Sequence, residues 1–468
     1  MKRVYTTCLL FMVSFQCIFG QSAELTYKTY CSGCHGAQMQ GGTASKLIKT
    51  DWKYGRGKGA IYRNIKFGIQ GTEMIAWGTV LKNEDISAVA DFIVKSQEVP
   101  PTALRPIPET LTTKDYVLKV EKLVSTGIHV PWGIEFVDKE KALITERKGS
   151  IRWLVNGKLD PEPVAGLPTA FVHNTGGYMD IALDPSYSKN GWIYFAYSHT
   201  KGDTADEKAA GMTKVIRGKI KDHRWMEEQT LFEVPDSLKI PGGNRWGSRL
   251  LFDKDGTLLF SIGDMARGND SQNPRKPTGK VFRINADGSI PKDNPYAGRK
   301  DALQEIFSIG NRNVQGITPH PVTGEIWATE HGPMGGDELN ILRKGANYGW
   351  PLVTYGVDYD GSIVSTEKMK EGMEQPVTQW TPSIGVCPAE FVTGNLFQSW
   401  TNNLLVGSLA FEEIRRLVIN NNKVVEEEIV MKGFGRVRDL KIGPDGAIYV
   451  LLNTPDMILR ITPVKKPD

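Results

Sequence analysis

Residues 117–466 repeat one short pattern, and that repetition is the strongest constraint on how the chain can fold. Each unit is a β-rich run, a turn containing Asp, Gly or Pro, and a second run with aromatic or branched residues. In the clearest unit, Gly443 to Gly446 form the turn between two apolar runs. The recognisable units span 133–145, 180–197, 249–263, 316–329, 403–419 and 439–452. Such recurrence favours small sheets repeated around an axis, so the sequence predicts an all-β six-bladed propeller.

A different pattern precedes the repeats. Several prolines and little periodic hydrophobicity mark residues 98–116, which predicts a semi-rigid linker. Before the linker, apolar residues recur at helical spacing from Ile86 to Ile93, and Asn83 is the expected cap of that helix. The chain is therefore expected to be multidomain, with a small all-α domain over residues 22–97 ahead of the propeller.

The first twenty residues have the pattern of a secretory signal peptide. Lys2 and Arg3 precede an apolar run from Leu9 to Phe19 that is too short to span a bilayer. No later stretch approaches eighteen apolar residues, so a periplasmic or secreted protein that is not membrane-spanning is predicted. The formal charge of +4 is too mild to predict a nucleic-acid partner.

Cys31, Cys34 and His35 form a Cys-x-x-Cys-His run in the small domain. Two thiols one turn apart can add to the vinyl groups of a heme, and the adjacent imidazole can bind the heme iron. The sequence therefore predicts a covalently bound heme c.

A second axial ligand is expected on the far face of the heme, where a thioether sulfur is a common choice. Met74 is the preferred candidate, because residues 24–97 resemble the small class of cytochrome c domain, in which a methionine loop precedes the last helix. Met39 is the alternative, but it lies only four residues beyond His35 and would have difficulty reaching the opposite face.

Two stretches of the propeller carry a specific resemblance. They run from Glu330 to Asn340 and from Gly345 to Pro351, and with them residues 117–465 resemble the soluble aldose sugar dehydrogenases that use pyrroloquinoline quinone (PQQ). The resemblance implies that the carbonyls of Gly332 and Pro333 bind a calcium ion that holds the quinone. Calcium takes hard oxygen ligands, and a turn with Gly and Pro can direct consecutive carbonyls to one point.

Two acids follow the calcium-binding turn. Asp337 and Glu338 are either solvated loop residues or groups that order the loop around the metal.

Three arginines are also implied to contact the quinone. Arg312 and Asn313 match the residues that face the quinone carbonyl, and Arg436 and Arg438 match those that clamp the cofactor carboxylates. A planar guanidinium pairs well with a carboxylate, and i, i+2 spacing on a strand places both groups on one face. Without the resemblance, ion pairs within the propeller would be the preferred interpretation.

The match fails where the family has its general base. Arg245, aligned through Ser248 and Arg249, replaces a histidine and stays protonated, so it cannot readily accept the substrate hydroxyl proton. Thr175 replaces a substrate-site glutamine of the glucose enzymes, and Ala410 replaces a cofactor-contacting lysine.

Several interpretations of the missing base stay open. Asp264 occupies the place of an active-site aspartate, although it could be only a turn residue after a strand, and His173 could act in its place or be a loop residue without a role. Alternatively, the substrate is a hydrated aldehyde or an acidic sugar that Arg245 binds, or oxidation has been lost.

The leading prediction is a dehydrogenase that oxidises a sugar or aldehyde through PQQ and calcium, passes the electrons to its own heme and then reduces a downstream redox protein. The first rival is a non-catalytic heme carrier whose propeller binds a protein or glycan. The second is a calcium-dependent hydrolase on the same scaffold, since a fold alone does not fix the chemistry.

Overall fold

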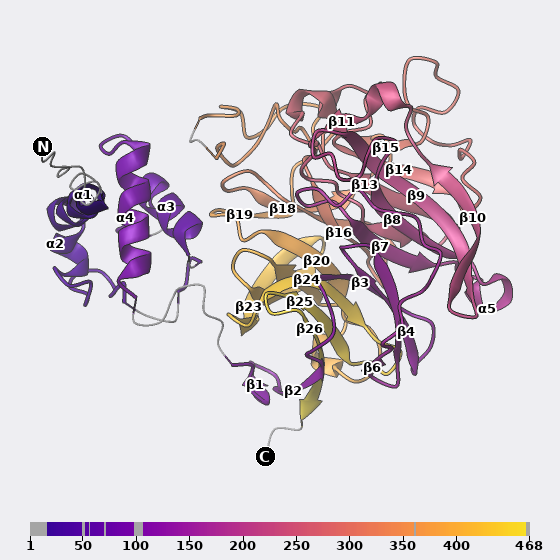
Figure 1. Ribbon diagram of the computed structural model, residues 1–468, viewed down its shortest axis with the longest axis horizontal. Coiled ribbons are helices and arrows are strands. Elements are labelled where there is room, and N and C mark those ends of the chain that lie inside the picture. The colour runs from indigo at the N-terminus through magenta and orange to yellow at the C-terminus, as the bar shows by residue number, and fades with distance from the viewer. Residues whose placement is uncertain are drawn as a thin grey trace, which may run out of the picture. The chain divides into compact units, whose positions relative to one another are not determined.

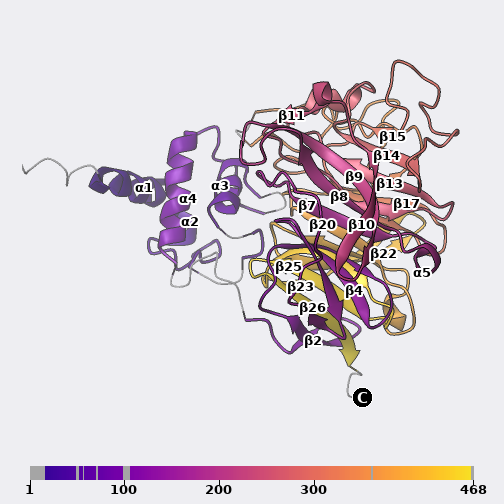
Figure 2. The ribbon, with the colours of Figure 1, turned by 45° about the vertical axis from the view of Figure 1, so that its right-hand side comes forward.

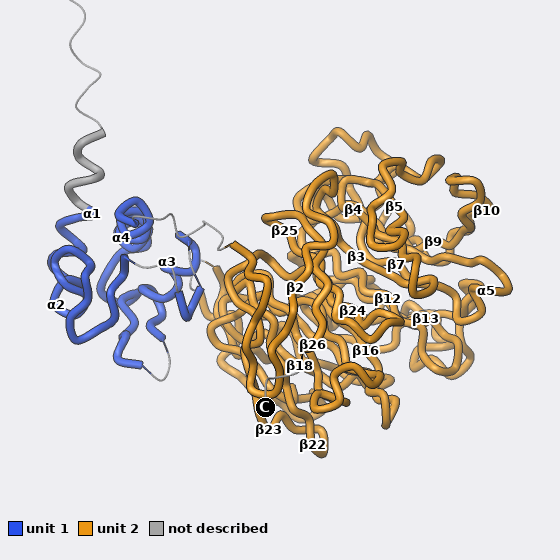
Figure 3. Tube along the Cα trace, turned by 90° about the horizontal axis from the view of Figure 1, so that it is seen from below, with its two compact units in different colours: residues 1–104 blue, residues 105–468 orange. Residues whose placement is uncertain are grey.

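The computed structural model describes residues 16–48, 52–55, 57–69, 72–97, 106–359 and 362–464, with side chains from residue 23 onward. The chain divides into two compact units, residues 1–104 and 105–468, which Figure 3 distinguishes by colour. Most of the predicted signal peptide, residues 1–15, lies outside the described residues. None of the helices in the described part of the chain has the length and apolarity needed to cross a membrane.

Helices form the described part of the first unit. They are α1 Gln16–Tyr30, α2 Ser32–His35, α3 Lys58–Phe67 and α4 Asn83–Lys95 (Figure 1). The apolar face predicted for α4 is buried against α1 and α3, with Ile86, Val89 and Ala90 each 0% exposed. Asn83 is not the N-cap as expected, because it is the first helical residue and its Oδ1 accepts a hydrogen bond from the hydroxyl of Tyr62 at 3.1 Å.

Six sheets form the described part of the second unit. Four of them are four-stranded meanders, one is a meander with an additional strand paired beside it, and one combines strands from both ends of the unit. The first three blades contain β3 Pro131–Phe136, β4 Lys141–Glu146, β5 Ser150–Val155 and β6 Lys158–Leu159; β7 Tyr178–Leu183, β8 Ile193–Thr200, β9 Ala210–Lys221, β10 Arg224–Phe232 and β11 Ile240–Pro241, with α5 Tyr187–Asn190; and β12 Leu250–Phe252, β13 Thr257–Ile262, β14 Lys280–Asn285 and β15 Ile306–Ile309. The next two contain β16 Val314–Pro319, β17 Ile326–Glu330, β18 Asp337–Leu342 and β19 Thr378–Trp380; and β20 Val386–Phe391, β21 Leu404–Ser408, β22 Glu413–Asn420 and β23 Lys423–Lys432.

The sixth blade joins the two ends of the propeller. It contains β24 Arg436–Ile442, β25 Ile448–Asn453, β26 Met457–Val464, β2 Val117–Val124 and β1 Thr110–Thr112. β2 runs antiparallel to β26, and Figures 1 and 2 show the two strands side by side. This pairing closes the ring without leaving an open sheet edge. The predicted six-bladed propeller is therefore confirmed, while residues 110–112, assigned to the linker by the sequence analysis, form an outer strand.

The inner strands surround the propeller axis and position the site. β3, β7, β12, β16, β20 and β24 contact one another in a closed ring. Because the blades repeat one meander around the axis, these strands all begin at the same end of the channel. Residues that precede or begin an inner strand, such as Arg249, Arg312 and Arg436, therefore meet at that end.

Candidate active site

The heme-binding run has a geometry that suits covalent attachment. Cys31 and Cys34 are free thiols, the second of them exposed. The His35 Nδ1 lies 2.9 Å from the carbonyl oxygen of Ser45, so this nitrogen is the donor and the Nε2 lone pair is left for a metal. Metal-binding histidines usually carry such a second hydrogen bond, which fixes the ring. The residues present therefore fit a heme c.

The two methionines differ in their surroundings. Met39 is 3% exposed and packs in the core with Tyr27 and Ile61. Its side chain is therefore already used in packing between the helices. Met74 lies at the edge of the same core and is only half-buried, in the loop before α4. This placement leaves Met74 the better candidate for the second axial ligand.

In the propeller, Arg312 contacts the turn implied to bind calcium. Its Nη1 donates to the carbonyl oxygen of Gly332 at 2.7 Å and to that of His331 at 3.1 Å. The guanidinium carbon lies 5.2 Å from the centre of the Trp350 ring. Arg312 is only 3% exposed, so the structure brings the first predicted arginine directly against the predicted turn.

Two buried acids hold these segments in place. Glu330 accepts hydrogen bonds from the backbone N–H groups of Arg312 and Asn313. Asp337 accepts from the N–H of Gly332 at 2.9 Å and, across the blades, from that of Val386 at 2.8 Å. Burial raises the pKa of both carboxyl groups. Of the alternatives for Asp337, the structure therefore shows a group that orders the loop.

The turn itself requires glycine. A Cβ on Gly332 would lie 2.2 Å from the carbonyl oxygen of Gly336. The oxygen of Pro333 accepts a hydrogen bond from the Ser383 hydroxyl at 2.9 Å. No group of three His, Cys, Asp or Glu side chains in the described part of the chain could hold a metal. A cation here would therefore depend on main-chain oxygens, which fit a hard ion such as calcium.

His331 is the residue on which the charges of the three arginines act together. Its pKa is lowered to about 3 by burial and by the charges of Arg312, Arg438 and Arg436, so the imidazole is neutral at physiological pH. Its Nδ1 lies 3.3 Å from the side-chain nitrogen of Asn313. Because an amide nitrogen can only donate, Nδ1 is the acceptor and Nε2 carries the proton.

That Nε2–H donor is buried and makes no hydrogen bond of good geometry among the described residues, although the Val386 carbonyl lies near enough to raise the pKa of the ring, and the buried Nε of Arg312 has no partner there either. Buried donors are normally satisfied. Two orphaned donors beside three guanidinium groups therefore fit an anionic ligand with several oxygen acceptors, which describes PQQ. In the sequence His331 stands out only as part of the Glu330–Asn340 stretch, because a neutral histidine has no local pattern that marks it.

The other two arginines come from one irregular strand. A bulge interrupts β24 between Val437 and Asp439, so i, i+2 spacing alone does not fix their directions. Arg436 is exposed and its Nη1 donates to the carbonyl of Leu409 at 3.2 Å. Arg438 is half-buried and its Nη1 lies 3.2 Å from the Gln315 Oε1.

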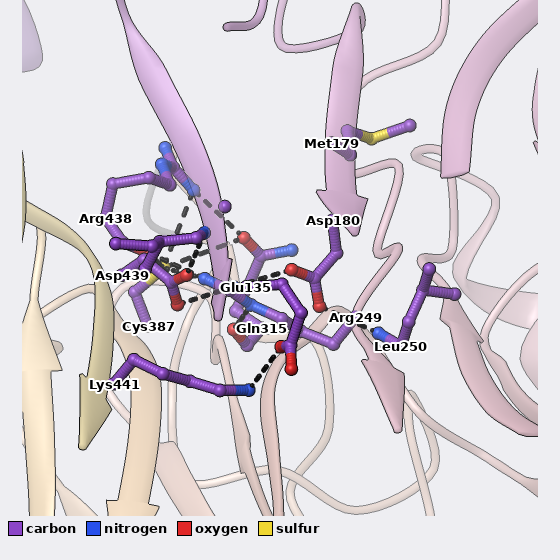
Figure 4. Close-up of polar contacts among 12 residues, drawn as sticks. Glu135, Met179, Asp180, Arg249, Leu250, Gln315, Cys387, Arg438, Asp439 and Lys441 are labelled. Carbon is purple, nitrogen blue, oxygen red and sulfur yellow. Dashed lines mark hydrogen bonds and ion pairs between the residues drawn. The ribbon is translucent and has the colours of Figure 1, made fainter. Parts of the chain in front are cut away.

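Arg249 makes polar contacts with residues of three other inner strands. Its Nη1 lies 2.7 Å from Asp439 Oδ1 and 3.4 Å from Asp180 Oδ1, and its Nε donates to the carbonyl of Gln315. Figure 4 shows the guanidinium between the two aspartates. Burial raises the pKa of Asp180 to about 6. A cavity of about 350 Å³ that reaches Lys441 is lined by these charges but not by Arg312, so it is separate from the site.

A second cluster adjoins the first through Trp350. Asp264 is 0% exposed, and its Oδ2 accepts from Trp350 Nε1 at 2.9 Å. Its Oδ1 accepts from the Arg245 Nε at 2.6 Å. The backbone N–H of Arg245 donates to the Thr175 hydroxyl at 3.3 Å. The residues at which the sequence departs from the family pattern, Thr175 and Arg245, therefore lie together beside Asp264.

His173 is not part of this cluster. Its Nε2 lies 2.9 Å from the side-chain nitrogen of Asn174, and its ring stacks on Phe171. Ala410 contributes a backbone hydrogen bond, in which its N–H donates to the carbonyl of Ile384. The structure thus brings Arg312, Asn313, Gly332, Arg438, Asp264 and Arg245 into one connected network and leaves His173 outside it.

The comparisons with known proteins agree with this geometry. The family model described as glucose / sorbosone dehydrogenase matches residues 128–460, and the model of cbb3-type cytochrome c oxidase subunit III matches residues 20–93. The aldose sugar dehydrogenase YliI of Escherichia coli is 36% identical over 341 residues, which cover 71% of this chain and 90% of that protein. Quinoprotein glucose dehydrogenase B of Acinetobacter calcoaceticus is 26% identical over 356 residues, covering 59% and 73% respectively.

Solved structures of related proteins share the fold of this chain. A crystal structure of a glucose dehydrogenase superposes with a TM-score of 0.69 at 34% identity, covering 75% of this chain and all of that chain. The apo form of the soluble aldose sugar dehydrogenase from Escherichia coli gives 0.68 at 32% identity, covering 74% and 100%.

Proposed function

The chain belongs to the glucose / sorbosone dehydrogenase family, and from that premise we propose that it oxidises a sugar or aldehyde with PQQ and passes the electrons to a heme c in its own first domain. The observation that supports this most strongly is the contact of Arg312 with the Gly332 turn beside the buried His331, whose pKa is lowered by burial and by the charges of Arg312, Arg438 and Arg436. A glycan-binding module has no need of three arginines, one of them buried, whose charges act on one neutral imidazole.

The roles of the residues follow from their positions. Bound PQQ supplies a carbonyl that accepts a hydride from the substrate carbon and later releases two electrons one at a time. Arg312 lies where it can stabilise the negative charge that develops on that carbonyl. Arg436, Arg438 and His331 would bind the cofactor acids, and the oxygens of Gly332 and Pro333 would hold calcium.

The substrate hydroxyl proton goes to Asp264 in this proposal. Arg245 is a permanent cation and His173 hydrogen-bonds away from the network, whereas Asp264 lies next to Trp350, which contacts Arg312. Its three donors, Arg245 Nε, Trp350 Nε1 and the Ala266 N–H, fix the carboxylate and leave one lone pair for the proton.

Reconstitution tests the proposed function. Purified full-length protein is loaded with PQQ and calcium and then mixed with aldoses, aldehydes and uronic acids while the heme absorbance is followed. At least one substrate should reduce the heme, and omitting PQQ or calcium should prevent it. A protein that binds PQQ tightly but whose heme stays oxidised with every substrate would contradict the proposal.

Asp264→Asn should lower kcat about 10²- to 10⁴-fold, the usual contribution of a general base. The asparagine Oδ1 can still accept from Arg245 and the Ala266 N–H, whereas its amide nitrogen cannot accept from Trp350 Nε1. The measurement is kcat against pH with an artificial dye as electron acceptor. If kcat falls but the pH profile keeps its shape, Asp264 positions other groups and is not the proton acceptor.

His331→Leu should weaken PQQ binding about 10- to 100-fold, because the orphaned donor and its neutral ring are both lost. Quenching of protein fluorescence during a PQQ titration measures this without any turnover. His331→Gln retains a donor and should recover most of the affinity. His223→Gln is the control, since His223 lies outside the site and pairs with Asp160 at 3.1 Å. Equal affinities for the leucine variant and the native protein would contradict the assigned contact.

A further inference from the structure

The guanidinium of Arg245 has hydrogen-bond donors at the site that are not engaged by the described residues. Only its Nε is engaged, with Asp264 Oδ1 at 2.6 Å, and within the described residues Nη1 and Nη2 make no hydrogen bond. The side chain is 24% exposed, while that of Asp264 is fully buried. The ion pair therefore anchors one edge of the guanidinium and leaves the other edge accessible.

Backbone conformation and contacts between two loops orient the Arg245 guanidinium. Arg245 has a φ of +62°, which is uncommon for a residue with a side chain. Its N–H donates to Thr175, and Asn174 reaches across to the Gly242 carbonyl at 3.3 Å, so two loops hold the turn. A guanidinium held this way loses little side-chain entropy when it binds a ligand.

The neighbouring charges are mostly positive. Asp264 neutralises Arg245, but Arg147, from the turn between β4 and β5, also reaches the loop beside Thr175, where its Nη1 donates to the Asn174 carbonyl at 2.6 Å. The network reaches Arg312 through Asp264 and Trp350. A neutral sugar can use only hydroxyl contacts with such a guanidinium, whereas a carboxylate can accept two parallel charge-assisted hydrogen bonds.

We propose that Arg245 is a specificity-determining residue that selects sugar acids, compounds with a carboxylate as well as the oxidisable hydroxyl or aldehyde. The inference rests on the proposed function and names the substrate class of that same site. Nη1 and Nη2 bind the carboxylate and thereby place the reacting carbon toward Arg312.

Binding of sugars that are blocked against oxidation at the anomeric carbon tests the inference by affinity and not by turnover. Methyl β-D-glucuronide and methyl β-D-glucoside differ at C6 alone, and both have a blocked anomeric hydroxyl. Calorimetric titration of the PQQ- and calcium-loaded protein should show about 10- to 100-fold tighter binding of the glucuronide, as expected for a charge-assisted pair. Equal binding, or tighter binding of the glucoside, would overturn the inference.

Substitutions at Arg245 test whether this residue causes the preference for the glucuronide over the glucoside. Arg245→Gln should remove the preference for the acid by weakening glucuronide binding about 10- to 100-fold while changing glucoside binding little. Arg245→Lys keeps the charge but not the planar guanidinium, so it should recover only part of the preference. Arg299→Gln, which breaks an exposed Arg299–Asp301 pair of 2.7 Å far along the chain, is the matched control and should keep the full preference. If Arg245→Gln keeps it too, the inference is wrong.

Heme reduction separates this inference from the proposed function. If glucose reduces the heme as efficiently as glucuronate, and Arg245→Gln leaves that ratio unchanged, the dehydrogenase stands and the selectivity fails. If neither sugar, nor any other substrate, reduces the heme of PQQ-loaded protein, the proposed function itself fails.

Discussion

Replacing Cys31 and Cys34 together by serine should abolish heme reduction by sugar completely, while the propeller continues to oxidise sugar with an artificial dye. The thiols of these residues are free and His35 is oriented by the Ser45 carbonyl, so the covalent bonds are the attachment that the variant removes. The propeller is a separate compact unit and should fold and bind PQQ normally. Heme staining of the denatured protein measures attachment, and absorbance measures sugar-dependent reduction.

Ser32→Ala is the matched control for the cysteine variant. Ser32 lies inside the same run, but its hydroxyl only donates to the Lys28 carbonyl at 2.6 Å. The control should keep both covalent heme and sugar-dependent reduction. If the double serine variant retained covalently bound heme, the assignment of these thiols would be wrong. If it lost dye-coupled oxidation as well, the two units would not be functionally separable.

Arg312→Met should lower dye-coupled kcat/KM about 10²- to 10³-fold at saturating PQQ, because one donor to a developing oxyanion contributes about 3–4 kcal/mol. Arg312 is 3% exposed, contacts the Gly332 carbonyl and faces Trp350. Its removal takes a buried cation from the position where charge develops. Saturating PQQ keeps the loss of cofactor affinity from dominating the measured rate.

Two variants delimit the effect of Arg312. Arg312→Lys keeps the charge but not the planar guanidinium, so an intermediate rate is expected. Arg343→Met removes an exposed arginine whose Nε lies 3.7 Å from Glu374, and its rate should be unchanged. Thermal unfolding of each variant distinguishes lost chemistry from lost folding. A rate for Arg312→Met within about threefold of the native rate would contradict an oxyanion-stabilising role.

The fold was more predictable from the sequence than the site. Turn residues and alternating apolar runs are local, so all six blades were found in the right order. The unit at 403–419 was displaced by one strand, since it covers β21 and β22, whereas the others begin at an inner strand. β1 was missed because the three residues Thr110–Thr112 form a strand only by pairing with β2.

Contacts between distant residues explain what was missed in the site. Arg245 and Asp264 are 19 positions apart and pair only because the loops of one blade bring them together. The importance of His331 comes from arginines on β24 and before β16, and no local pattern predicts it. No contact of Arg249 was predicted from the sequence, yet in the structure this residue links Asp180, Gln315 and Asp439 from three inner strands.

The central claim is that electrons pass from the propeller to the heme of the same molecule. Anaerobic stopped-flow mixing of PQQ- and calcium-loaded full-length protein with substrate tests it most directly. We expect the rate constant of heme reduction to stay the same over an approximately hundredfold range of protein concentration, because an attached acceptor needs no encounter. A rate that rises in proportion to protein concentration, or a heme that stays oxidised while dye reduction proceeds, would contradict the account.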